Sequence, residues 1–246
     1  MDRIVYSPGL EPIGKDYYNT WPGMGREPVA GDVSRWLELL ARAVPDEPLR
    51  KWLLCWFAYP LQNLGCKLTT YVYLYGPGGC GKGALLAPFF GIYGDRNAVQ
   101  VGRERLVSDF NSIYASRQFV HVDEIHSGAD RDGLALTNKI KMLTTADKLT
   151  VNAKGAPEYV VDNHLNLVVT GNYSDCIKLD DDDRRCCVIK AGGGAEVVRD
   201  EAYWRPYWDW ATSAEGQAAL YAYLLQVDMT GFNPHGWAPI LSLIHI

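Results

Sequence analysis

Residues 69–86 read TTYVYLYGPGGCGKGALL, and this stretch limits the possible folds more than any other in the chain. The β-branched and aromatic residues of TTYVYLYG are typical of a buried strand, and Ala84 to Phe90 opens a helix. The turn between them follows the pattern G-x-x-x-x-G-K-[ST], except that Gly83 replaces the final hydroxyl residue. In such loops, backbone N–H groups close around phosphate oxygens at a helix N-terminus. The predicted phosphate loop comprises Gly76, Pro77, Gly78, Gly79, Cys80, Gly81, Lys82, Gly83 and Ala84.

The rest of the chain predicts alternating strands and helices. Apolar spacing after Asp32, a candidate N-cap, predicts a helix over 33–44, and a second helix over 49–64 is expected to bend or end near Pro60. Further helices are expected at 134–143 and between 203 and 225, strands at 118–124, 165–172 and 185–190, and a hairpin at 149–161. This alternation indicates an α/β layer fold with a mainly parallel central sheet flanked by helices.

Composition excludes few functions. The chain has 246 residues and a formal net charge of −5, which argues against a generally basic nucleic-acid coat but not against a few local cations. Its six cysteines form no metal-ligand spacing, so we interpret them as reduced thiols of an intracellular protein. No signal peptide and no apolar run of about 20 residues is present, so no membrane partner is expected. The predicted location is the cytoplasm of a host cell.

Polar residues at the ends of two predicted strands suggest chemistry beside the loop. Asp123 and Glu124 end the apolar strand that starts at Phe119, and Asn172 ends the next one. Next to a phosphate loop, Asp123 would act on Mg²⁺, Glu124 would polarise an attacking water, and Asn172 would orient water against the outer phosphate. The alternatives are a solvated strand end for the acids and a turn-forming Gly-Asn pair for Asn172.

Three cations are candidates for binding nucleotide or DNA phosphates. Arg184 and Arg185 follow the acidic run LDDDD and could supply an arginine finger, and plain surface charge is the alternative interpretation. Lys154 is expected at the tip of the hairpin, where an exposed ammonium group suits a nucleic-acid backbone. A solvated turn lysine is equally compatible with that position.

The order of these motifs resembles the superfamily III helicases, and more narrowly the helicase domains of primase-helicases from phages, plasmids and large DNA viruses. The resemblance rests on GPGGCGKG, HVDE, TVNAKG, VVTGN and DDDRR, with YYNTWPG before them and GFNPHGWAPI after them, and covers roughly residues 17–240. It implies a P-loop NTPase of AAA+-like fold that uses ATP and Mg²⁺. It further implies that Lys82 binds phosphate, that Asp123 and Glu124 form the Walker B pair, that Asn172 is the sensor, that Arg184 or Arg185 is the finger, and that Lys154 contacts DNA.

From this resemblance we expect an ATP-dependent DNA helicase that translocates on single-stranded or forked DNA as a homo-oligomeric, hexameric ring. A primase domain or a replication-origin protein is a possible partner. The alternatives are a nucleoside monophosphate kinase-like phosphotransferase and an inactive nucleotide-binding scaffold. Gly83 raises the question of what holds the metal, and we expect phosphate oxygens, Asp123 and waters to complete the Mg²⁺ shell.

The same reasoning divides the chain into four parts. Residues 1–30 are expected to be an irregular lead-in, 31–68 a helical segment, and 69–240 the P-loop ATPase domain. The last six residues, LSLIHI at 241–246, match the translation of a sequencing adapter, so we interpret them as read-through without function.

Overall fold

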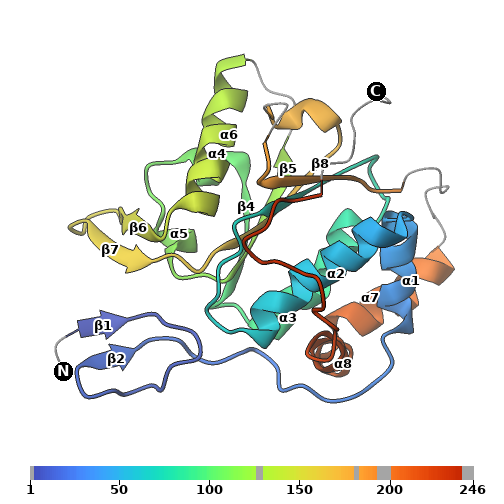
Figure 1. Cartoon of the computed structure of the whole chain (residues 1–246), viewed down its shortest axis with the longest axis horizontal. Coiled ribbons are helices and arrows are strands. Elements are labelled where there is room, and N and C mark those ends of the chain that lie inside the picture. The colour runs from blue at the N-terminus through green and yellow to red at the C-terminus, as the bar shows by residue number, and fades with distance from the viewer. Residues whose placement is uncertain (1–2, 126–129, 180–182, 193–200, 240–246) are drawn as a thin grey trace.

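A computed structural model of the chain describes residues 3–125, 130–179, 183–192 and 201–239. The side chains of residues 124, 125 and 130–132 are outside this description, as is the 241–246 tail that was interpreted as read-through. Figure 1 shows a central sheet with helices on both of its faces and a small pair of strands near the N-terminus. The expected α/β architecture is therefore confirmed.

Five parallel strands form the central sheet in the spatial order β4-β5-β8-β3-β9. Their bounds are β3 Tyr71–Tyr75, β4 Ala98–Gly102, β5 Phe119–Ile125, β8 Asn166–Gly171 and β9 Cys186–Lys190. Four of them lie where the sequence predicted strands. The fifth strand, β4, was not predicted. It is a short, half-covered edge strand, so its sequence carries only a weak alternation of buried and exposed residues.

Helices cover both faces of the sheet (Figure 1). One face carries α1 Ser34–Ala43, α2 Glu47–Gln62, α3 Lys82–Tyr93, α7 Glu201–Thr212 and α8 Ala214–Leu224. The other carries the short helices α4 Arg103–Val107 and α5 Ser112–Ala115, together with α6 Asp130–Thr145. Side chains of β3 alternate between the two cores: Val72 and Leu74 pack into the first, and Tyr71 and Tyr73 into the second.

The two N-terminal helices follow the predicted pattern with small differences at their ends. Residue Val33 is the N-cap of α1 and makes no side-chain cap, while Asp32 instead accepts from the Ser34 amide at 2.9 Å. The α2 helix does not end at Pro60 but continues to Gln62. Pro60 lies in the last turn of α2. Proline has no backbone N–H to donate, and the helix continues for only two residues beyond it.

The outlying segments are two small sheets. The predicted hairpin consists of β6 Lys148–Val151 and β7 Tyr159–Asp162, paired antiparallel from Lys148↔Asp162 to Val151↔Tyr159. Within the lead-in, which was expected to be irregular, β1 Arg3–Val5 and β2 Tyr17–Asn19 pair in parallel. A 3-10 turn, η1 Ser174–Cys176, follows β8. None of the described helices is both long and apolar enough to cross a membrane.

Candidate nucleotide-binding site

The glycine loop lies at the carboxyl edge of the sheet, between β3 and α3. Its amide at Gly76 donates to the Gly171 carbonyl at the end of β8, 3.1 Å away. Gly79 and Gly81 adopt φ values of 81° and 94°, which only glycine reaches without strain. A Cβ atom on Gly81 would lie 2.8 Å from the Leu39 side chain, so the loop also needs glycine there for space. The sequence therefore fixes a tight turn that opens a buried helix.

Unsatisfied backbone donors in this loop match a phosphate ligand. Within the described residues, the amides of Gly79 and Gly81 donate to no acceptor, and the first turn of a helix has further free N–H groups. Lys82 Nζ instead donates to the loop carbonyls of Gly76 at 2.7 Å and Pro77 at 3.1 Å. An ammonium group held over its own loop can turn to an incoming polyphosphate without moving the backbone. These residues therefore fit a nucleoside polyphosphate.

Asp123 is held at the same edge by a network that the sequence reasoning did not find. One carboxylate oxygen accepts from Gln100 Nε2 at 2.6 Å, and the other accepts from the Thr170 hydroxyl at 2.7 Å. The Thr170 oxygen in turn lies 2.9 Å from Nε2 of the buried His121. Because the Thr170 proton points to Asp123, His121 donates through Nε2, which fixes its neutral tautomer. The result is a chain of donors from His121 through Thr170 to Asp123.

His121 stays uncharged in this environment. Burial lowers the pKa of the imidazole to about 4, although the Asp123 carboxylate opposes that shift. Its Nδ1 atom is buried and has no hydrogen-bond partner within the described residues, as expected of a neutral ring that donates through Nε2. The network thus holds the Asp123 carboxylate at the carboxyl edge of the sheet while His121 itself stays neutral.

The register of the strands brings the other candidates to this edge. Asp123 pairs with Gly102 of β4, and Leu74 of β3 lies opposite Thr170 of β8. Asn172 follows directly after β8, is exposed, and is one residue beyond the carbonyl that accepts from the loop. The backbone of Glu124 belongs to β5, next to Asp123, and its side chain lies outside the described residues.

Arg184 and Arg185 lie at the opposite edge of the sheet. They precede β9, whose first residue Cys186 pairs with Tyr71 at the amino end of β3. The glycine loop begins after Tyr75, which pairs with Lys190 at the other end of β9. At about 3.3 Å per residue, the arginines are separated from the loop by roughly the length of the strand, on the order of 15 Å. Within one chain they do not join the nucleotide site.

Lys154 lies at the exposed tip of the β6–β7 hairpin, in a turn closed by the Ala156 amide and the Ala153 carbonyl at 3.1 Å. It forms no ion pair with a described residue. The predicted turn is confirmed, and its contact with DNA stays a prediction.

Comparisons with known proteins identify proteins to which this chain is similar. The model of a protein family of unknown function, DUF5906, matches residues 74–185, which is just under half of the chain. The DNA primase-polymerase of Nitratiruptor phage NrS-1 is 24% identical over 202 residues, which cover 76% of this chain and 28% of that protein. The chain thus spans little more than a quarter of the length of this curated relative.

Solved structures of the NrS-1 C-terminal region share the fold. One apo structure superposes with a TM-score of 0.77 at 20% identity, covering 92% of this chain and 56% of that one. A second, the A form, gives a TM-score of 0.74 at 22% identity and covers 89% and 54%.

These findings correct the predicted function. The expectation of an ATP-dependent DNA helicase was wrong, because the similar proteins are a primase-polymerase and its C-terminal region. The physical reason is that the motifs describe only the local turn and the polar residues at one edge of a sheet. Neither the loop nor the acidic strand end specifies the activity of the protein.

Proposed function

We propose that this chain is a nucleoside triphosphate-binding module of a phage DNA-replication protein of the primase-polymerase kind. The observation that carries the proposal is the convergence of the Gly76–Lys82 loop, Asp123 and Asn172 at one sheet edge. The replication setting is supported by the similarity to the NrS-1 protein. The strand order, with β3 between β8 and β9 and the loop following β3, supports a P-loop-type nucleotide fold.

The roles of the residues follow from their charges and positions. Lys82 would contact the outer phosphates, and the amides of Gly79 and Gly81 would donate to the oxygens between them. Asp123 would hold Mg²⁺, which needs few protein oxygens because it keeps several waters. The metal would neutralise phosphate charge, while Gln100 and Thr170 keep the Asp123 carboxylate in place.

We further propose that Glu124 polarises a water for hydrolysis of the bound triphosphate. This role rests on its sequence position beside Asp123. DNA is the expected macromolecular partner, and the exposed Lys154 at the hairpin tip is a candidate contact.

Binding of a fluorescent ATP analogue with Mg²⁺ tests the proposal directly. Lys82→Ala should weaken binding at least about 10-fold, because a charge-assisted contact of about 1.5–3 kcal/mol is lost. Lys15→Ala, which removes an exposed lysine of the lead-in, is the matched control and should bind like the parent chain. Equal affinity of the Lys82→Ala variant and the parent would refute the assignment of the loop.

Glu124→Gln separates binding from hydrolysis. It should bind the analogue normally and slow the release of inorganic phosphate, since the carboxylate acts on water and not on the ligand. A wild-type rate of phosphate release would remove Glu124 from the site.

A further inference from the structure

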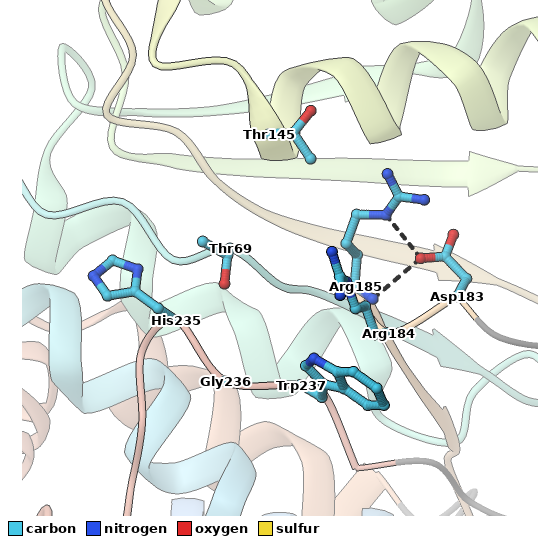
Figure 2. A pocket seen from close by; sticks show the side chains of 8 residues that line it. All are labelled: Thr69, Thr145, Asp183, Arg184, Arg185, His235, Gly236 and Trp237. Carbon is cyan, nitrogen blue, oxygen red and sulfur yellow. Dashed lines mark hydrogen bonds and ion pairs between the residues drawn. The ribbon is translucent and has the colours of Figure 1, made fainter.

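A cavity lies at the amino edge of the sheet, away from the glycine loop. It measures about 690 Å³ and is lined by four separate stretches of chain, namely Thr69, Thr145, 183–185 and 235–237 (Figure 2). The stretch 231–240, GFNPHGWAPI, has no role in the proposed nucleotide site. It supplies the exposed aromatic wall of this cavity through Trp237.

Backbone hydrogen bonds hold the 233–238 strap in place before any ligand arrives. The Ala238 amide donates to the Arg184 carbonyl at 2.9 Å, and the Thr69 amide donates to the Pro234 carbonyl at 3.3 Å. Asn233 closes a turn by accepting from the Gly236 amide at 3.0 Å. A Cβ on Gly236 would lie 3.1 Å from Asn233, so glycine permits this tight turn. The cavity is therefore preformed.

The charged side chains that line the cavity differ in whether they are paired with an opposite charge. Asp183 accepts from Arg185 Nε at 2.9 Å and lies 3.4 Å from Lys141 Nζ, so its charge is already matched. No described residue accepts from the two terminal nitrogens of Arg185. Arg184 is exposed and forms no ion pair with a described residue. Its guanidinium carbon lies 5.6 Å from the centroid of the Trp237 ring instead.

Trp237 is the unusual member of this group because 67% of it is exposed. This exposed indole offers a flat apolar surface, and the guanidinium group of Arg184, which forms no ion pair with a described residue, lies next to it. A nucleotide has the complementary parts, namely a planar base that can stack and a phosphate that arginine binds.

We propose that this cavity binds a nucleotide unit, with its base stacked on Trp237 and its phosphate on Arg184 and Arg185. The site takes either a free nucleotide or a nucleotide within a single strand, since both present the same base and phosphate. It lies within one chain and is separate from the glycine loop. The proposal therefore goes beyond the proposed function and differs from an arginine finger, which would reach the nucleotide of another subunit.

The test uses the full chain carrying Lys82→Ala, so that the glycine loop contributes little nucleotide binding. Titration calorimetry with dTMP and, separately, with a 12-residue oligo(dT) measures the two sources. Trp237→Ala should weaken binding about 5- to 150-fold, the range expected for loss of one base–aromatic stack. Trp237→Phe should retain most of the affinity, because it keeps a stacking ring.

Arg184→Gln should lower the slope of log affinity against log salt for oligo(dT) by about 0.7, the value for one single-strand phosphate contact. The controls are Trp208→Ala and Arg35→Gln, which remove an exposed tryptophan and an exposed arginine that do not line the cavity. Both should bind like the Lys82→Ala parent. Thermal melting of each variant checks that it is folded.

The outcomes separate the sources and decide the proposal. Trp237-dependent binding of dTMP assigns the cavity to a free nucleotide, and Trp237-dependent binding of oligo(dT) alone assigns it to a strand. If folded Trp237→Ala and Arg184→Gln bind both ligands like the controls, or if the Lys82→Ala parent binds neither, the cavity is not a nucleotide site. The proposed function stands or falls separately, because it is measured at Lys82 with ATP.

Discussion

At the scale of single residues, the candidate site depends on groups whose importance is not visible in the sequence. His121 and Thr170 are ordinary residues of two predicted strands, and Gln100 belongs to a strand that was not predicted. Together they hold the Asp123 carboxylate through hydrogen bonds of 2.6–2.9 Å. The position of Asp123 is therefore a property of three strands and not of the Asp-Glu motif alone.

Neutral His121 should make the stability of the protein depend on pH. Its pKa of about 4 lies below the ordinary value of 6.5, so the unfolded chain binds the proton first as the pH falls. This contribution to stability is complete above pH 6.5 and is lost as the pH falls toward 4. Between pH 7 and 4.5 we expect a loss of about 2–3 kcal/mol from this residue, measured by urea unfolding.

His121→Gln should remove that part of the pH dependence, even though it lowers stability at pH 7. His235→Gln, which changes an exposed histidine, should leave the pH dependence unchanged. An unchanged loss of stability in His121→Gln would show that His121 is not the titrating group.

Gly83 can be tested by adding back the missing hydroxyl. It is exposed in the first turn of α3, and a Cβ there would meet no atom within 4 Å, so serine fits without a clash. Gly83→Ser should tighten Mg²⁺-dependent binding of an ATP analogue several-fold, because it adds one oxygen ligand and loses the flexibility of glycine in a helix. Gly83→Ala gains the helix effect without the oxygen, so equal gains in both variants would rule out a metal contact.

At the scale of elements, the β6–β7 hairpin is anchored through β6 and exposed at its tip. Asn111 donates to the Thr150 carbonyl at 2.8 Å and accepts from the Asn152 amide at 2.8 Å, which fixes the hairpin near α5. Leu149 and Val151 are buried, whereas Tyr159 and Val160 of the facing strand are more than half exposed. Lys154 is thus presented to solvent on a rigid support.

Lys154→Ala should weaken binding of single-stranded DNA similarly for all sequences and lower the salt slope by about 0.7. Lys148→Ala is a matched control on the same hairpin, because Asp162 already pairs with that ammonium group at 2.7 Å. Filter binding over a range of salt concentrations measures both. Equal effects of the two substitutions would mean that net charge, and not a contact at the tip, is responsible.

At the scale of the whole molecule, the parallel sheet places the candidate acidic and arginine residues at opposite edges. The loop and Asp123 lie at the carboxyl edge, and Arg184 and Arg185 lie at the amino edge. Arg184 and Arg185 could therefore act at the glycine loop only of another copy of the chain. A ring of subunits, which we proposed from the resemblance, remains a prediction.

If Arg184 or Arg185 acts between subunits, ATP hydrolysis should rise steeply with protein concentration through assembly. A mixture of Lys82→Ala with an Arg184→Ala, Arg185→Ala double variant should then recover activity that each lacks alone. Activity should recover because some interfaces in the mixture join an intact loop to an intact arginine pair. An arginine finger supplied in this way raises the hydrolysis rate about 10³–10⁵-fold. Proven co-assembly without recovery at any mixing ratio would exclude a finger in trans.

The sequence by itself determined the local features of this protein. Runs of β-branched residues placed β3, β5, β8 and β9, and the glycine pattern placed the turn before α3, because these signals depend on neighbouring residues only. The hairpin and its turn at Gly155 were found in the same way. The lead-in strands and β4 were missed, since three to five half-exposed residues carry too weak a pattern.

Only the tertiary structure decided which of these features lie together. Strand order and register place Gln100, His121 and Thr170 around Asp123, and they bring four distant stretches together around the cavity at Trp237. The same register separates Arg184 from the loop that the motif order had suggested it serves. Such contacts come from pairing between strands that are far apart in the chain, and a linear pattern does not record which edge of a sheet a residue occupies.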